Sequence, residues 1–322
     1  MKTALVCGAG GFIGGHLVSR LKQDGYWVRA IDRKQHEFKT LDADEFVLGD
    51  LRDASFCGGA IDIAFDEVYQ LAAEMGGAEF VYDSRHDATI LRDSIIIDLH
   101  VLSNCLKHGT QRIFFASSAC VYPRRNQLDP NNPICDEDSV YPADPDSEYG
   151  WNKLFGERLY LAHERTGVLQ PRIARYHNVF GPQGAWRGGR EKAPAALCRK
   201  VAEAPDEGSI DIIGDGQQTR SFLFISECIE GTVRLMRSDV PGPLNIGSDE
   251  MVTIDDLADL IIDISGKTLR KNYIPGPIGV RGRNSDNRRI RKVLGWAPSK
   301  SLRTGLERTY AWIEIQVSAK RQ

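Results

Sequence analysis

A tyrosine and a lysine four residues apart are the first groups in this sequence that could do acid–base chemistry. In the segment SEYGWNKLFGE, Tyr149 and Lys153 fall on one face of a predicted helix, because residues i and i+4 are neighbours on a helix surface. A lysine cation beside a phenol favours the phenolate and lowers the pKa of the tyrosine from its ordinary value of about 10. Tyr149 is therefore a candidate base for an alcohol during hydride transfer.

A serine pair in FFASSACVYP, residues 114–123, supports this interpretation over that of a surface Tyr–Lys pair. The two serines end a hydrophobic run that is typical of a buried strand. Ser118 can hydrogen-bond the same substrate oxygen as Tyr149 and help to hold a developing alkoxide or enolate. Two residues later stands Cys120, a thiol whose purpose the strand itself does not explain.

A glycine-rich turn near the N-terminus predicts a dinucleotide-binding loop. Gly8, Gly11 and Gly14 are spaced as GxxGxxG between a predicted strand and a predicted helix. The first permits the turn, the second lets the backbone approach a pyrophosphate, and the third lets helix and strand pack closely. Phe12 and Ile13 complete the loop, and Asp32 ends the second predicted strand.

The cofactor follows from Asp32, which is placed to accept hydrogen bonds from the adenosine ribose. Its charge would repel a 2′-phosphate, so NAD is expected. Arg33 and Lys34 are possible phosphate ligands for NADP, but solvated loop charges are the simpler interpretation. Asp50 and Leu51 either hold the adenine edge or form a plain turn.

The elements that must position these residues alternate along the first half of the chain. Short apolar or β-branched runs predict strands at residues 3–7, 26–32, 45–48, 67–73, 112–118 and 170–176. Between them, helices are expected at residues 11–23, 87–107 and 148–165. This alternation predicts an α/β fold with a Rossmann-type, doubly wound parallel sheet covered by helices on both faces.

The second half of the chain predicts a smaller lobe. After Gly181, loops rich in glycine and proline surround shorter helices expected at residues 254–264 and 302–315. Residues 1–176 should thus form an NAD-binding domain and residues 177–322 mainly a C-terminal α/β substrate lobe, with some later segments returning to the first domain. Ligands of open α/β sheets bind beyond the carboxyl ends of the strands, so the site is expected between the lobes.

Composition argues against several other classes of protein. The chain has 322 residues and a net charge of -3, which leaves no broad basic field for nucleic acid or a membrane surface. Seven scattered cysteines lack metal-ligand spacing, so no metal is expected and a reducing, cytoplasmic location is favoured. No apolar run approaches the roughly 20 residues of a membrane span.

Together these motifs resemble the extended short-chain dehydrogenases that act on nucleotide sugars. The shared features are GxxGxxG, the serine at 118, YxxxK and the segment HNVFGP at residues 177–182, and the resemblance covers nearly the whole chain. It implies that bound NAD oxidises a nucleoside diphosphate sugar transiently, usually at C4. The altered sugar is then reduced by the same NADH.

The residues after Ser118 should decide which alteration takes place. Where 4,6-dehydratases of this family carry Asp and Glu, this chain has Ala119 and Cys120, so Cys120 stands where C5 chemistry is done. A ketone at C4 acidifies the hydrogens at C3 and C5, and inversion needs a base on one face of the ring and an acid on the other. A thiol, with an ordinary pKa near 8.5, can serve in either role.

Lys192 is the candidate partner for Cys120. It lies in WRGGREKAPAALCRK, just ahead of Pro194 and a predicted helix. The positive end of that helix and Arg190 are expected to lower the pKa of Lys192 and so permit proton exchange. The competing interpretation is a cluster of surface cations or phosphate ligands, which applies more to Arg190 and Lys200.

Within this family the chain is similar to the GDP-mannose 3,5-epimerases. The similarity rests on SSACVYP, MGG at residues 75–77, GGREKAPAA, GDGQQTRSF and GVRGRNSDN. It implies an isomerase that converts GDP-α-D-mannose to GDP-L-galactose through inversion at C5 and C3, with GDP-L-gulose as by-product.

The same similarity assigns sugar or diphosphate contacts to Gly77, Ser118, Ala119, Cys120, Tyr149, Asn178, Glu191, Lys192, Lys200, Gln218, Thr219, Arg220 and Arg281. Arg220 and Arg281 would offer paired donors to phosphate oxygens. Arg283 is close enough to Arg281 to compete for that role.

One departure from the family lies at Asp93 and Ser94, where relatives carry asparagines; this puts in doubt any water or proton relay through that helix. The resemblance also implies a homodimer, formed through the helices near residues 88–107 and 149–165. Two alternatives remain. One is another nucleotide-sugar enzyme, a 4-epimerase or a decarboxylase-like relative, and the other is a non-catalytic NAD-binding regulator.

Overall fold

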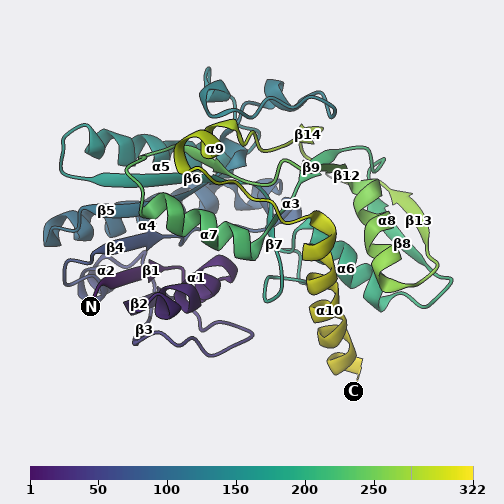
Figure 1. Cartoon of the computed structure of the whole chain (residues 1–322), viewed down its shortest axis with the longest axis horizontal. Helices are drawn as coiled ribbons and strands as arrows, with labels where there is room; N and C mark the ends of the chain where they lie inside the picture. Colours follow the sequence, from purple (N-terminus) through teal and green to yellow (C-terminus); the bar gives the residue numbers. More distant parts are fainter. Residues whose placement is uncertain (277, 322) are drawn as a thin grey trace.

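Seven parallel strands form the central sheet (Figure 1) of the computed structural model, which describes residues 1–276 and 278–321. Across the sheet the strands lie in the order β11-β6-β5-β4-β1-β2-β3. Their bounds are β1 (Thr3–Cys7), β2 (Trp27–Asp32), β3 (Glu45–Leu48), β4 (Glu67–Gln70), β5 (Arg112–Ser118), β6 (Gln170–Tyr176) and β11 (Leu244–Ile246). The chain winds outward from β1 to both sides, which confirms the predicted Rossmann-type, doubly wound sheet.

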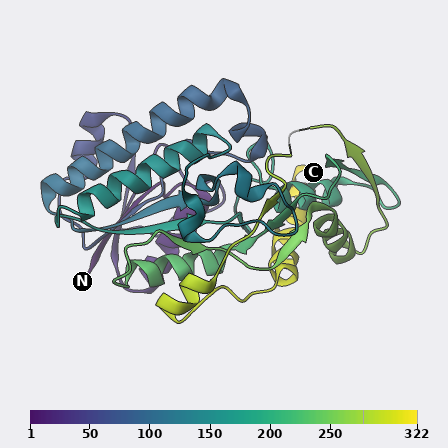
Figure 2. The ribbon, with the colours of Figure 1, turned by 90° about the horizontal axis from the view of Figure 1, so that it is seen from above.

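Helices cover both faces of this sheet, as Figure 2 shows. On one face lie α1 (Phe12–Gln23) and α7 (Ile225–Met236). On the other lie α2 (Ala54–Ala60), α4 (Asp87–His108) and α5 (Glu148–Glu164). Side chains of a strand alternate between the faces, so Ala4 and Val6 of β1 join the larger buried cluster, whereas Leu5 and Cys7 join the second one.

Among the described residues, three helices and five strands from the second half of the chain form a smaller lobe beside the carboxyl ends of the sheet strands. Its sheets pair β8 (Ser209–Ile213) with β13 (Arg270–Ile274), and β9 (Thr219–Ser221) with β12 (Met251–Thr253) and β14 (Gly282–Arg283). Its helices, which pack on one another, are α6 (Ala193–Glu203), α8 (Ile254–Ser265) and α10 (Leu302–Arg321). This lobe agrees with the predicted second, smaller α/β unit.

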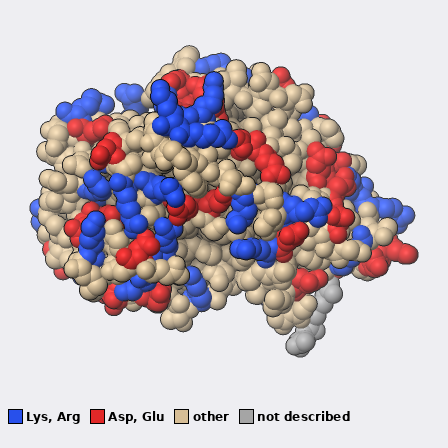
Figure 3. Space-filling view, in the orientation of Figure 1, with Lys and Arg blue, Asp and Glu red and all other residues tan. Residues whose placement is uncertain are grey.

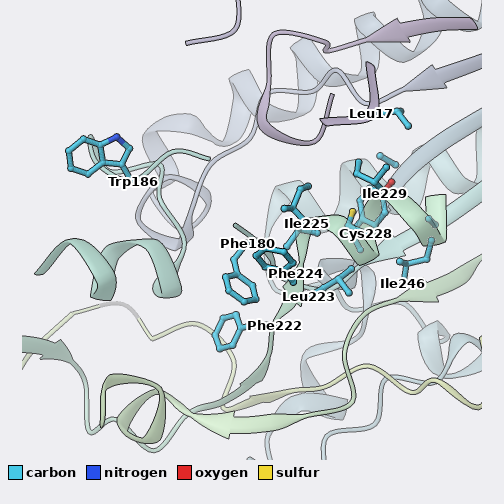
Figure 4. Close-up of a cluster of buried hydrophobic side chains, with 14 of the residues drawn as sticks. Leu17, Phe180, Trp186, Phe222, Leu223, Phe224, Ile225, Cys228, Ile229 and Ile246 are labelled. Atoms are coloured by element: carbon cyan, nitrogen blue, oxygen red, sulfur yellow. The ribbon is translucent and has the colours of Figure 1, made fainter. Parts of the chain in front are cut away.

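Short elements join the two parts. They are β7 (Val179–Phe180), β10 (Leu223–Phe224), α3 (Ala78–Val81), α9 (Arg288–Leu294) and the single turns η1 (Ser84–His86), η2 (Ala119–Val121), η3 (Arg124–Gln127) and η4 (Glu137–Val140). β7 and β10 pair in parallel. Around them Phe180, Phe222 and Phe224 lie together near Ile225, within the larger buried cluster (Figure 4).

One predicted strand ends earlier than expected. The pattern predicts a strand at residues 67–73, but β4 ends at Gln70. Residues 71–73 leave the sheet to pass over the glycine-rich loop, where a Cβ on Gly8 would lie 2.8 Å from the backbone nitrogen of Ala72. The apolar sequence continues past the strand because Leu71 and Ala72 pack against the buried clusters there.

On the face seen in Figure 3, Lys and Arg side chains are interspersed with Asp and Glu. Within residues 1–276 and 278–321, no helix combines the length and the apolar character needed to cross a membrane.

Candidate active site

The glycine-rich loop holds a close contact between β1, α1 and the end of β2. Gly8 has a φ of 86°, in the left-handed region that favours glycine. A Cβ on Gly14 would lie 2.2 Å from the carbonyl oxygen of Gly8, so α1 could not approach the loop with any other residue there. Gly10, which the spacing GxxGxxG does not single out, donates its N–H to Asp32 Oδ2 over 3.0 Å. Gly10 and Gly11 are adjacent in the sequence. This pair of glycines was the signal that could have indicated the contact between Gly10 and Asp32.

A cavity of about 560 Å³ runs from this loop across the ends of the strands. Its lining includes every residue predicted to contact the cofactor: Gly8, Gly11, Phe12, Ile13, Gly14, Asp32, Asp50, Leu51, Tyr149 and Lys153. The loop would face the pyrophosphate and Asp32 the adenosine ribose, so the residues present fit NAD. Arg33 is no free phosphate ligand, because its guanidinium pairs with Glu74 at 3.0 Å.

The far end of the cofactor cavity is organised by Arg52. Its guanidinium hydrogen-bonds both Asp50 and the buried Asp93, and all three residues line the cavity. Ser94 instead accepts a hydrogen bond from the backbone of Glu74 at 3.1 Å. Asp93 therefore belongs to the wall of the cofactor cavity, whereas Ser94 lies behind it and holds Glu74, which lines the cavity.

Ser118, Tyr149 and Lys153 meet at the other end of the cofactor cavity. Ser147 caps α5 by accepting from Gly150 N over 3.3 Å, which places Tyr149 in the first turn of the helix. Ser118 at the end of β5 hydrogen-bonds the Tyr149 phenol, and Lys153 Nζ lies 5.7 Å from the centre of the Tyr149 ring. The sequence predicted this set, and the structure brings it together.

The pKa of Tyr149 departs from the predicted direction. Burial, reinforced by Cys120, raises it, although the hydrogen bond with Ser118 acts to lower it. Lys153 is only 3% exposed, and burial lowers its pKa while the nearby Asp98 acts to raise it. Desolvation of the phenol thus outweighs the effect predicted for the lysine cation.

Asp98 of α4 is a buried carboxyl group that sequence reasoning missed. It is 1% exposed and accepts a hydrogen bond from Gln70 Nε2 at 2.8 Å. Burial raises its pKa to about 6, although Lys153 and Gln70 act in the opposite direction. Asp98 lies four residues after Ser94 and therefore on the same face of α4, which packs against α5. This spacing was the signal for Asp98 in the sequence.

A second cavity, of about 250 Å³, lies between the sheet and the smaller lobe. It shares a wall with the cofactor cavity, and the residues that line both are Met75, Gly76, Ser118, Tyr149, Tyr176 and Lys192. Ser118 and Tyr149, two of the residues predicted to act in hydride transfer, thus stand where a ligand in one cavity would meet a ligand in the other.

Cys120 and Lys192 both line the second cavity. Burial lowers the pKa of Lys192, as does Arg283, while Cys120 acts to raise it. The direction agrees with the prediction, but the main cause is burial and not Arg190, which pairs with Glu74 at 2.9 Å. Arg283 Nη1 donates to Cys120 Sγ over 3.1 Å.

Most of the predicted sugar and diphosphate contacts line this second cavity, namely Gly77, Ser118, Ala119, Cys120, Tyr149, Asn178, Glu191, Lys192, Lys200, Gln218 and Arg220. Two do not. Thr219 is buried and donates to the carbonyl of Pro130, and Arg281 pairs with Asp215 at 3.1 Å. Arg283, paired in register with Arg220, takes the place in the lining predicted for Arg281.

This combination of a dinucleotide-binding sheet and a Ser–Tyr–Lys set between two cavities is that of an NAD-dependent enzyme of the short-chain dehydrogenase type. Residues 4–247 match the model of the NAD dependent epimerase/dehydratase family, and the chain belongs to this family. NAD is its cofactor.

Two relatives and one solved structure illustrate the similarity. GDP-mannose 3,5-epimerase of Arabidopsis thaliana is 44% identical over 98% of this chain and 83% of the relative. GDP-mannose 3,5-epimerase 1 of Oryza sativa subsp. indica is 44% identical over 98% and 82%. The UDP-glucose 4-epimerase of Thermotoga maritima, solved with UDP-glucose, is 25% identical, superposes with a TM-score of 0.87, and is matched over 98% of this chain and 100% of that one.

Proposed function

We propose that this protein is a GDP-mannose 3,5-epimerase, which converts GDP-α-D-mannose to GDP-L-galactose and releases GDP-L-gulose as a by-product. The observation that carries the proposal is the placement of Cys120 and Lys192 beside Ser118 and Tyr149 in one cavity. Identity of 44% to plant enzymes of this name supports the choice of substrate.

The reaction begins and ends at the shared wall. When bound, NAD supplies the hydride acceptor for the C4 hydrogen and the donor for its return. Tyr149 removes the proton of the C4 hydroxyl and gives it back at the end, while Ser118 holds the C4 oxygen. Burial raises the Tyr149 pKa, and the hydrogen bond with Ser118 acts to lower it and so favours removal of the substrate proton.

Inversion takes place while C4 is a ketone. One of Cys120 and Lys192 removes the C5 proton, leaving an enolate, and the other returns a proton to the opposite face of C5. The same exchange at C3 completes the inversion, and reduction at C4 then gives the product. The lowered pKa of Lys192 makes a neutral amine accessible, so that the lysine can both take and give a proton.

The diphosphate is expected to bind Arg220. This half-buried guanidinium lines the second cavity and donates to the backbone carbonyls of Thr219, Ile278 and Val280. Burial and the nearby Arg283 lower its pKa to about 10. A diphosphate would supply the negative charge that these contacts lack.

Product analysis by NMR after incubation with GDP-mannose in heavy water tests the proposal. Deuterium should enter at C5 and C3 of the hexose, and the product should be GDP-L-galactose with some GDP-L-gulose. No label at either carbon would overturn the proposal.

A 4-epimerase is the second candidate, favoured by the structural similarity to UDP-glucose 4-epimerase. It would invert C4 without exchange at carbon, so the same spectrum separates the two. The regulator alternative predicts no conversion of any nucleotide sugar, although Tyr149 and Lys153 are both in place.

Cys120→Ala tests the role of the thiol directly. It should keep bound NAD and most of its affinity for GDP-mannose, because the other residues that line the two cavities are unchanged, and should lose epimerisation at C5 by about 100-fold or more. Full activity in this variant would remove Cys120 from the mechanism.

A further inference from the structure

A buried carboxylate lies behind the wall of the second cavity. Asp146 precedes α5 by two residues, and its side chain is 5% exposed. One oxygen, Oδ2, accepts from the Tyr82 hydroxyl over 2.5 Å and from Arg283 Nη2 over 3.3 Å. The other oxygen is buried without a hydrogen-bond partner. Tyr82, Cys120 and Arg283 line the cavity, whereas Asp146 does not.

Arg283 connects this carboxylate to the thiol. Its Nη1 donates to Cys120 Sγ over 3.1 Å, and its Nε donates to the buried Gln127 over 2.5 Å. Three side chains thereby fix the guanidinium. Among them Asp146 carries a negative charge, and Cys120 is ionisable. A carboxylate beside a guanidinium partly cancels its field, so Arg283 stabilises a thiolate less than an unpaired arginine would.

We propose that Asp146 is a positioning residue that acts through Arg283 to set how readily Cys120 gives up and regains its proton. Tyr82 holds the carboxylate in place by donating to the oxygen that Arg283 uses. This inference rests on the proposed role of Cys120 in proton exchange, because only a thiol that both takes and gives a proton needs such a balance.

Other ionisable groups also act on the thiol. Those that face it from the surrounding elements are Tyr82, Tyr149, Lys192, Arg220 and Arg283. Burial acts to lower the pKa of Arg283, but Cys120 and Asp146 raise it overall, so the guanidinium remains charged throughout. The balance between Asp146 and Cys120 across Arg283 is therefore the coupling to test.

Alkylation of Cys120 by iodoacetamide as a function of pH measures this coupling without any sugar nucleotide. The other six cysteines are buried, which leaves Cys120 as the accessible thiol among the described residues. Cys120→Ser, with mass mapping of the adduct, identifies the reacting site.

Asp146→Asn keeps the size of the side chain and removes its charge. The pH midpoint of alkylation should fall by about one unit, because Arg283 then acts on the thiol alone. At low pH the rate should rise about fourfold, since a tenfold gain in thiolate is offset by its weaker nucleophilicity, and the plateau at high pH should fall about 2.5-fold. A cavity that had merely opened would react faster at every pH.

Tyr82→Phe is the matched control. It also removes a hydrogen bond to Asp146 but keeps the carboxylate charge and its contact with Arg283, so the midpoint should move by less than about 0.3 unit. If Asp146→Asn does not fold, Arg283→Gln tests the same coupling with the opposite sign and should raise the midpoint. An unchanged midpoint in a folded variant would overturn the inference.

The two proposals can fail separately. Lack of conversion of GDP-mannose with a shifted midpoint in Asp146→Asn would remove the proposed substrate and keep the role of Asp146. Exchange at C5 with an unshifted midpoint would do the reverse.

Discussion

Tyr149 shows how far burial can change an expected side-chain property. Its neighbours are those predicted, but the phenol is 8% exposed and its pKa is raised. Burial of the phenol thus opposes its ionisation in the protein alone, and the hydrogen bond with Ser118 acts in the opposite direction.

Replacement of this tyrosine is the simplest test at the scale of a residue. Tyr149→Phe should lower turnover of GDP-mannose by about 10²–10⁴-fold, because acid–base catalysis at C4 is lost. Most of the NAD should still copurify, since the phenyl ring remains and the glycine-rich loop, Asp32 and Lys153 are untouched. A variant with more than a tenth of the original turnover would assign the base elsewhere.

Asp98 predicts a pH dependence of stability. Its pKa is about 6 in the folded chain and about 3.9 in an unfolded chain. The folded state therefore binds the additional proton between these values, so the ionised carboxyl reduces stability as pH rises from about 4 to about 6.

Asp98→Asn should remove this slope. Relative to the original protein, the variant should gain up to about 3 kcal/mol in free energy of unfolding between pH 4 and pH 7, because about two pH units separate the folded and unfolded titrations. Urea unfolding at both pH values measures the difference. An equal difference at the two pH values would mean that Asp98 titrates normally.

Individual residues were predictable where a short motif names them, and otherwise not. Ser118, Tyr149, Lys153 and the glycines follow from local spacing. Asp146 and Arg283 come together from positions 137 residues apart, a distance at which no local pattern exists. The choice between Arg281 and Arg283 depends on the pairing of β14 with β9. No local pattern in the sequence predicts this pairing.

At the scale of elements, the loop ahead of α6 connects the smaller lobe to the cofactor cavity. Arg190 pairs with Glu74 at 2.9 Å, donates to the Met75 carbonyl at 3.1 Å and lies 4.2 Å from the centre of the Phe80 ring. Gly188 and Gly189, with φ of 90° and 81°, give the loop a path that other residues rarely adopt. Arg190 lines the cofactor cavity, so this loop should retain the cofactor between the two hydride transfers.

Arg190→Ala should therefore release NAD more quickly. Loss of a partly exposed ion pair and a cation–π contact corresponds to about a tenfold faster release, measured from NADH fluorescence during exchange. Arg187→Ala is the matched control, because Arg187 lies in the same loop but stacks on Trp186 and does not line the cavity. Equal release rates in the two variants would contradict this role.

Elements were predicted best where their pattern is regular. The strands at residues 112–118 and 170–176 agree residue for residue with β5 and β6, because interior parallel strands are short apolar runs with clear ends. The strand at residues 45–48 also agrees with β3, although β3 lies at the edge of the sheet. β4 was predicted too long, since an apolar segment that covers a ligand cavity has the same composition as a buried strand. The helix expected at residues 302–315 continues to Arg321, because nothing in its sequence ends it earlier.

At the scale of the whole molecule, α4 and α5 lie side by side on one outer face of the sheet, as Figure 2 shows. Leu99 of α4 and Trp151 and Phe155 of α5 are 41%, 42% and 42% exposed. Large apolar groups on adjacent helices are typical of an interface between subunits. They support the homodimer that the family resemblance implies.

Trp151→Glu with Phe155→Glu should convert that dimer to a monomer, because two buried carboxylates would face the same surface of the partner copy. Sedimentation velocity measures the mass. Ile315→Glu changes an apolar residue that is 63% exposed on α10 and should leave the mass unaltered. If the unsubstituted protein sediments as a monomer, the prediction of a dimer is wrong.

The wall shared by the two cavities has an energetic consequence. Ser118, Tyr149 and Lys192 contact both spaces, so a sugar nucleotide meets a different surface when the neighbouring nicotinamide is oxidised than when it is reduced. By linkage, any preference of the sugar for one redox state shifts the midpoint potential of the bound cofactor by the same free energy. A ligand of the second cavity that has such a preference is thereby also an effector of the cofactor's redox potential.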